Sequence, residues 1–123
     1  MDPQVLEQRI HNRLFEYVEW VRDYERQSEP RLGIDELLNQ WEDFLTRPIC
    51  EANYPAPAFT ADEIEALKRL DNGWELLCSA TPKHIANDSK VFKMSEWAAF
   101  VACAADAARV FQMRGKLPED FVL

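Results

Sequence analysis

The sequence predicts an all-α fold: a compact bundle of four main helices, with a Pro-rich loop between the second and the third. Apolar residues make up 47% of the 123 residues and recur three and four positions apart in four segments. Glycine occurs only at positions 33, 73 and 115, and runs of β-branched residues are almost absent, which favours helices over a hairpin-rich sheet. We therefore expect one helical domain over residues 1–123, which at this length can fold without disulfides or a structural metal.

The first two helices are predicted from apolar stripes and from the residues that interrupt them. The first covers residues 3–27 and the second residues 34–46. Glu29-Pro30 and Gly33 separate them, and Pro48 ends the second. The seam of the first helix alternates spacings of four and three residues through Ile10, Leu14, Tyr17, Val21 and Tyr24. The stripe of the second consists of Ile34, Leu37, Leu38, Trp41, Phe44 and Leu45.

The Pro-rich loop covers residues 47–59, and we expect Ile49, Tyr54 and Phe59 to order it against the body. The third helix follows. Thr60 and Glu63 form a capping-box pattern at its start. It reaches residue 80, because Trp74 and Cys78 stay in phase beyond Gly73.

A polar connection over residues 82–94 precedes the fourth helix, and one short extra turn around His84 is an option within it. The fourth helix is predicted from a Ser95 cap to Arg114, with Gly115 as the residue that ends it. Its many alanines allow close approach of a neighbour, which suits a central position in the bundle. We expect Phe121, in the short apolar segment that follows, to dock back onto the body.

Composition limits the class of partner and the compartment. The net charge of −8 disfavours general binding to a phosphate backbone, so we expect no direct contact with nucleic acid. The longest apolar stretch, residues 97–105, is too short to span a bilayer, so no membrane association is expected. Asp2, Glu7 and Arg9 leave no apolar core for a signal peptide. Three cysteines at unrelated spacings suit reduced thiols, so the predicted location is cytoplasmic.

The sequence carries no recognisable catalytic, metal or nucleotide motif, so we expect neither an enzyme nor a bound cofactor. A nucleophile needs a base beside it, yet His11 and His84 lie in different elements without a local motif. Cys78 and Cys103 fall on or near apolar helix faces, where a thiol usually packs as a small hydrophobe. Cys50, in the loop, is expected to be more exposed.

One alternative is a small helical hydrolase that depends on a metal. Glu16-x-x-Glu19 is similar to the first half of the carboxylate motif of helical nucleotide pyrophosphohydrolases, but the Glu-x-x-Asp of the second half does not follow. In this alternative Glu16, Glu19 and Asp23, on one side of the first helix, hold Mg²⁺ through oxygen ligands.

The distribution of charge favours a protein-binding function. Residues 33–80 contain ten acidic and three basic residues, a net charge of −7, whereas residues 81–94 carry a net charge of +2. Such a run is either a solvated surface or a face that steers and holds a basic partner. The leading hypothesis is a non-enzymatic protein-binding domain, most concretely a small acidic inhibitor of the immunity-protein type that neutralises a basic enzyme such as a nuclease toxin. Its candidate contact residues are Asp35, Glu36, Glu42, Asp43, Asp62, Glu65 and Glu75.

Two aromatic residues of the first helix lie away from its seam. Phe15 points nearly to the opposite side and Trp20 to the flank. Either this helix is buried on more than one side, with Phe121 or the loop around Tyr54 covering it, or the two aromatics are exposed anchors for another chain. A homodimer through the first helix, as a structural or adaptor subunit, is a further alternative.

Overall fold

The computed structural model describes residues 1–27 and 33–123, and this part of the chain contains helices and no strand. The all-α prediction is confirmed. The Glu29-Pro30 break lies outside the described residues. The helices are α1 Pro3–Asp23, α2 Ile34–Phe44, α3 Ala61–Ala80, α4 Asp88–Val91 and α5 Ser95–Gln112, with a single 3-10 turn, η1 Tyr24–Arg26, directly after α1.

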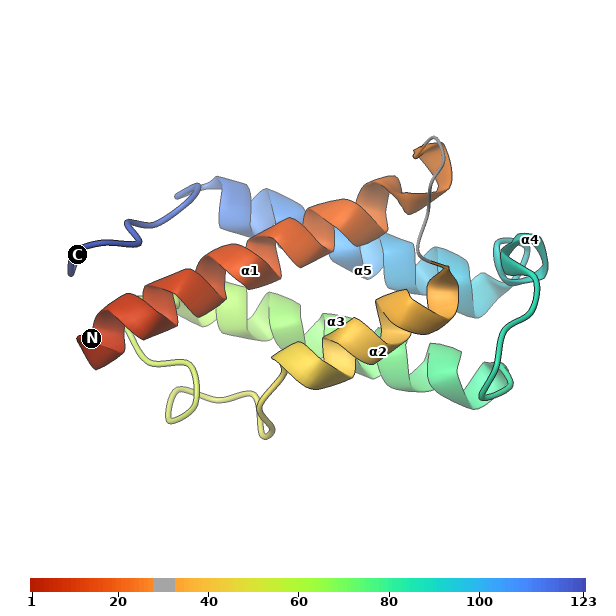
Figure 1. Cartoon of the computed structure of the whole chain (residues 1–123), viewed down its shortest axis with the longest axis horizontal. Helices are drawn as coiled ribbons and strands as arrows, with labels where there is room; N and C mark the ends of the chain where they lie inside the picture. The colour runs from red at the N-terminus through yellow and green to blue at the C-terminus, as the bar shows by residue number, and fades with distance from the viewer. Residues whose placement is uncertain (28–32) are drawn as a thin grey trace.

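The four long helices form an up-down-up-down bundle (Figure 1). α1 and α3 run in one direction, and α2 and α5 run in the opposite direction. α5 packs against both α1 and α3. Its buried alanines, Ala104, Ala107 and Ala108, leave room for this close approach.

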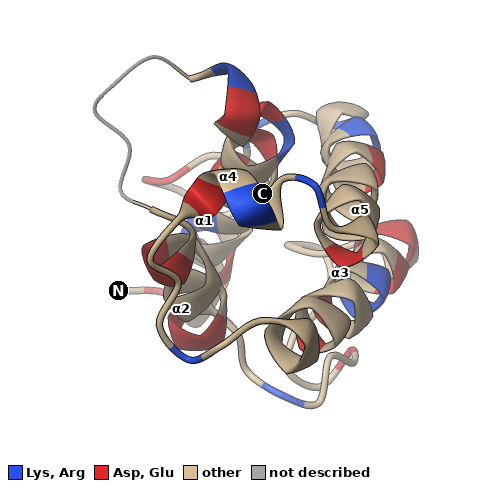
Figure 2. Ribbon diagram, turned by 90° about the vertical axis from the view of Figure 1, so that its right-hand side faces the viewer, with Lys and Arg blue, Asp and Glu red and all other residues tan. Residues whose placement is uncertain are grey.

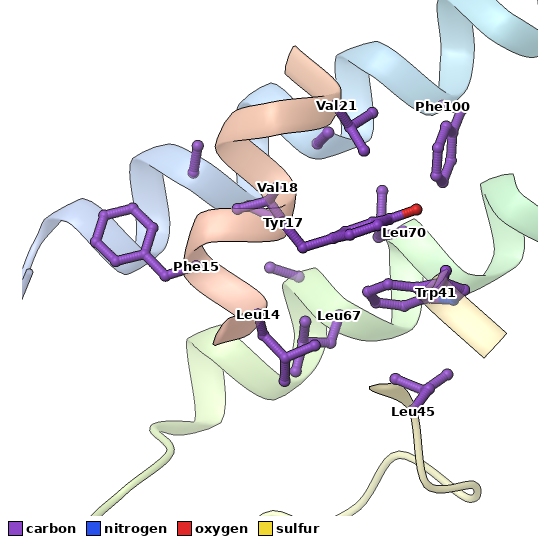
Figure 3. Packing of buried hydrophobic residues seen from close by; sticks show 14 of the residues in the cluster. Leu14, Phe15, Tyr17, Val18, Val21, Trp41, Leu45, Leu67, Leu70 and Phe100 are labelled. Carbon is purple, nitrogen blue, oxygen red and sulfur yellow. The ribbon is translucent and has the colours of Figure 1, made fainter. Parts of the chain in front are cut away.

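Aromatic side chains fill the centre of the bundle. Trp41 of α2 and Trp97 and Phe100 of α5 are completely or almost completely buried. Tyr17 of α1 lies beside Trp41, with ring centroids 5.4 Å apart, and its hydroxyl donates to the Leu37 carbonyl (Figure 3). The apolar stripes of the helices therefore meet in one core, as expected for a bundle.

Two helix ends differ from the prediction. α1 ends at Asp23 instead of residue 27, and the chain tightens into η1, where the Tyr24 N–H donates to the Val21 carbonyl. α2 ends at Phe44 instead of residue 46. Leu45 is extended and buries its side chain, and the Thr46 N–H donates to the Tyr54 hydroxyl at 3.0 Å instead of to a helix carbonyl.

The loop that follows α2 is ordered by buried side chains, as predicted from Ile49, Tyr54 and Phe59. The Thr60–Glu63 capping box at the start of α3 is confirmed.

The connection between α3 and α5 folds differently from the expectation. The prediction of a helical turn around His84 is wrong, because the short helix of this connection is α4, Asp88–Val91. Asn87 caps α4 by accepting the Ser89 N–H at 3.0 Å, whereas the Ile85 N–H is bound by Asp35.

The predicted Ser95 cap of α5 is wrong: the helix already begins at Ser95, Met94 is the cap residue, and the Ser95 hydroxyl donates to the Glu96 carboxylate. The helix ends at Gln112, two residues earlier than predicted. Gly115 ends this region as expected: its φ of +73° is left-handed, and its N–H donates to the Phe111 carbonyl at 2.9 Å. The prediction that Phe121 docks onto the body is wrong, because this residue is 64% exposed.

α3 continues through Gly73, as predicted, and this position gives a stability test. A Cβ added there would lie 3.7 Å from Phe100 Cα, which is an ordinary van der Waals contact. We expect Gly73→Ala to raise the free energy of unfolding by about 0.5–1 kcal/mol, because alanine favours the helix and restricts the unfolded chain. Urea denaturation measures this change, and a loss of stability would show that α3 and α5 cannot accommodate a methyl group.

Candidate protein-binding site

The outward face of α2 is acidic. The helix buries Ile34, Leu37, Leu38 and Trp41, and the helical period therefore places its four carboxylates away from the core. No residue of α2 is basic, and the charged segments of its ribbon are all acidic (Figure 2). The carboxylates are those of Asp35, Glu36, Glu42 and Asp43.

Glu75 of α3 lies next to this face. The Trp74 indole N–H donates to the Leu38 carbonyl at 3.0 Å, which holds α3 against α2. Cys78 lines a hollow together with Asp35 and Leu38 of α2, and Glu75 precedes Cys78 by three residues on α3. Burial raises the pKa of the Cys78 thiol, and the negative charges of Glu42 and Glu75 raise it further. We define the acidic patch as Asp35, Glu36, Glu42, Asp43 and Glu75.

Two members of the acidic patch are engaged within the molecule. Asp35 accepts the Ile85 N–H at 2.9 Å, and its Oδ2 lies 3.1 Å from His84 Nδ1. Glu42 pairs with Arg47, at 3.1 Å. Glu36, Asp43 and Glu75 form no ion pair within the described ranges. These three exposed carboxylates carry the uncompensated charge of the patch.

Arg47 joins the end of α2 to α3. Besides Glu42 it binds Asp71, at 2.7 Å, and its guanidinium lies 5.1 Å from the centre of the Trp74 ring. The hydrogen bond to Asp71 is the main reason why the pKa of Arg47 is raised. Arg47 therefore acts as a cross-link at the edge of the patch.

Asp62 and Glu65 lie toward the other end of α3 from Glu75. Both lie in the first turns of α3, ten or more residues before Glu75, which corresponds to about 15 Å or more along the helix. Glu65 also pairs with Lys68, at 3.2 Å. The sequence interpretation grouped them because a charge sum over a window does not separate one end of a helix from the other.

The two off-seam aromatics have different environments. The hypothesis that Phe15 is an exposed anchor is wrong. Phe15 is 3% exposed and packs edge-on against Phe111 of α5, with ring centroids 5.8 Å apart. The covering element is α5, not Phe121. Trp20 is half-buried: its N–H donates to Gln27 at 3.2 Å, and the ring lines a hollow between α1 and α2.

The carboxylates of the hydrolase alternative are each next to a cation. Glu16 lies 3.0 Å from Lys116, and Glu19 lies 4.0 Å from Arg22. Asp23 binds Arg22 at 2.7 Å, and this hydrogen bond is the main cause that lowers its pKa. Over residues 1–27 and 33–123, no group of three or more His, Cys, Asp or Glu side chains is arranged to hold a metal ion.

The three cysteines are free thiols, and all are partly buried. Cys78 and Cys103 pack against the core, as predicted from their helix faces. Cys50 is less exposed than expected for a loop residue.

A buried polar network joins α1 to the start of α3, and the sequence analysis did not predict it. His11 and Glu63 are buried, with His11 Nε2 3.0 Å from Glu63 Oε2. Arg114 donates to Glu63 Oε1 at 2.6 Å, and the Thr60 N–H donates to the same oxygen at 2.9 Å. Burial by itself would raise the pKa of Glu63, but the hydrogen bonds from His11, Arg114 and Thr60 outweigh it and the pKa is lowered. Glu63 is therefore a buried carboxylate that stays ionised.

Asn12 connects His11 to the segment that follows α5. Asn12 Nδ2 donates to the Leu117 carbonyl at 2.9 Å and to Glu119 at 2.8 Å, and Asn12 Oδ1 accepts the Leu117 N–H. The Asn12 atom 3.2 Å from His11 Nδ1 is therefore an oxygen. Both ring nitrogens of His11 therefore lie beside side-chain oxygens, Nδ1 beside Asn12 and Nε2 beside Glu63.

The same side of α1 holds the segment 116–123. Gln8 is completely buried, and its Nε2 donates to the carbonyls of Pro118, at 2.7 Å, and Phe121, at 2.8 Å. Its Oε1 accepts the Leu123 N–H at 3.1 Å. The main chain of this segment is thus docked although the Phe121 side chain is not. We assign the network a structural role, since it connects α1, α3 and the segment after α5.

Comparison with family models, with curated proteins and with solved structures finds no match to this chain. Among the described helices, none combines the length and the apolar character needed to cross a membrane. The functional argument therefore depends on the surface chemistry of the chain itself.

Proposed function

We propose that this chain is a non-enzymatic protein-binding domain whose acidic patch holds a basic protein. The observation that carries the proposal is the outward face of α2, which presents four carboxylates and no basic side chain. Glu75 extends this charge onto α3. In its most concrete form, the domain is a small inhibitor of the immunity-protein type that neutralises a basic enzyme, such as a nuclease toxin.

The charge arrangement supports fast and selective association. Complementary charge increases the rate of encounter and excludes wrong partners, and it adds less to affinity. Salt screens the attraction between exposed charges beyond about 8–10 Å at physiological ionic strength. A local group of carboxylates therefore attracts a partner more effectively than the net charge of the whole chain does. A phosphate-binding groove of a nuclease is a basic surface that an acidic helix fits. The three partly buried free thiols suit a reducing compartment, and we place the action in the cytoplasm.

Capture from lysate of the native host at low salt tests the proposal with two matched variants. The patch variant is Glu36→Gln, Asp43→Asn and Glu75→Gln, which removes the three unpaired carboxylates. The control variant is Glu51→Gln, Asp62→Asn and Glu65→Gln, which makes the same three chemical changes elsewhere on the surface. We expect one stoichiometric basic protein to bind the wild type and the control. Binding to the patch variant should fall about threefold to a hundredfold, since each of the three exposed charge pairs contributes roughly 0.2–1 kcal/mol.

Equal recovery of that protein by the patch variant and the control would refute the role of the acidic patch. The inhibitor form has its own readout, which is the activity of the captured protein. An equimolar amount of the wild-type chain should abolish this activity, and the same amount of the patch variant should leave most of it.

A further inference from the structure

A groove that runs along α1 lies next to the acidic patch. Two hollows of about 380 and 420 Å³ share Arg13 and Phe44 and therefore lie side by side along α1. α2 ends at Phe44 and therefore leaves one side of the first half of α1, at Leu6 and Ile10, without a covering helix. Leu6, which lines the first hollow, is 50% exposed. We define the α1–α2 groove by Leu6, Ile10, Arg13, Tyr17, Trp20 and Phe44.

The groove has the length and spacing of a helix-binding site. Leu6, Ile10, Arg13 and Tyr17 are four, three and four residues apart, so they follow one face of α1. From Leu6 to Trp20 this face extends about 21 Å, or roughly four helical turns. An amphipathic helix laid in such a groove inserts anchors at the same spacing.

The two walls of the groove carry opposite charge. On the α1 wall, Arg13 is exposed and forms no ion pair with any described residue. Arg9 lines the same hollow, with its Nε donating to the Glu119 carbonyl. Glu16 lines the second hollow from the same helix, but Lys116 pairs with it at 3.0 Å, so Arg13 carries the uncompensated charge of this wall. On the α2 wall, Asp43 directly precedes Phe44, and the Glu36 carboxylate lies 3.4 Å from the Gln40 amide that lines the groove.

We propose that the basic partner docks through an amphipathic α-helix that lies in the α1–α2 groove. Its apolar face packs on Leu6, Ile10 and Phe44. A flank of Lys or Arg faces Glu36 and Asp43 of α2, and a flank of Asp or Glu on the other side faces Arg13 of α1. This inference rests on the proposed function and specifies how the acidic patch is used.

A library of displayed helical peptides of about 16 residues tests the proposal. The peptides keep leucines at the anchor spacing and have random residues on both flanks. Selection on the wild-type chain should enrich sequences with basic residues on one flank and acidic residues on the other. Enrichment of nothing, or of sequences without this segregation, would overturn the proposal.

Two matched double variants locate the binding of an enriched peptide. Leu6→Glu with Arg13→Glu changes the groove, and Leu76→Glu with Arg69→Glu makes the same changes on the outer face of α3. All four side chains are exposed, so both proteins should fold. The dissociation constant should rise at least tenfold in the groove variant and stay within twofold in the control. An equal rise of the dissociation constant in both variants would contradict the proposed docking helix. Self-association of the wild type that the groove variant abolishes would contradict it as well.

The captured partner separates this inference from the proposed function. If the patch variant loses the partner and the groove variant retains it, the acidic patch acts without a docking helix, and only the further inference fails. If both variants retain the partner, the proposed function itself fails.

Discussion

Replacement of Glu63 by Gln should destabilise the protein by about 3–5 kcal/mol, because it removes the buried carboxylate that the Arg114 guanidinium and the His11 ring bind. Glu63 is 1% exposed and lies between His11 and Arg114. Glutamine keeps the shape of the side chain and also satisfies a capping box, so α3 keeps its cap. The amide instead presents N–H groups to donors that need an acceptor. Chemical denaturation of the wild type and the variant measures the loss.

The adjacent residue provides the control. Asp62→Asn removes the same charge one position earlier, where the side chain is exposed and unpaired within the described structure. Its expected effect is within about 0.5 kcal/mol. A Glu63→Gln variant as stable as Asp62→Asn would show that the buried network does not stabilise the bundle.

Acid should remove the stabilising contribution of ionised Glu63 from the wild-type protein. The pKa of Glu63 is lowered from its ordinary value of 4.5, because the hydrogen bonds to the carboxylate outweigh its burial. The folded state therefore holds the proton less tightly than the unfolded state, and stability falls as the pH decreases. The contribution of Glu63 to stability is complete at pH values above the ordinary pKa of the unfolded state. It disappears as the pH falls through the lowered pKa of the folded state.

The Glu63→Gln variant isolates this part of the pH dependence. Its side chain is neutral at every pH, so the difference in unfolding free energy from the wild type should be largest near about pH 7 and shrink steadily below about pH 4. Urea denaturation over this pH range measures the difference. If the difference stays constant into strong acid, ionisation of Glu63 is not the source of the stability.

The helices were predictable because each has one apolar stripe that faces a common core. The acidic face of α2 was predictable for the same reason: its four carboxylates fall opposite Leu37 and Trp41. Helix ends were less predictable. At Leu45, burial of a side chain and a hydrogen bond to the Tyr54 hydroxyl favour an extended residue, and both depend on the distant loop.

The buried network was missed because α1 was interpreted with a single seam. Val5, Gln8, Asn12 and Phe15 recur at spacings of three and four, and this second stripe was the available signal. Polar side chains in a stripe usually indicate solvent. Here they face the segment 116–123, whose backbone they bind, and no local pattern places that segment beside α1.

The central claim is that the acidic patch on α2 and Glu75 binds a basic protein. Its most direct test is the dissociation constant of the captured partner as a function of salt concentration, measured for the wild type, the patch variant and the control variant. We expect the wild type and the control to share one steep dependence. At low salt the patch variant should bind at least about threefold more weakly than the wild type, and its dissociation constant should change less with salt concentration. Coincidence of all three curves would contradict the claim.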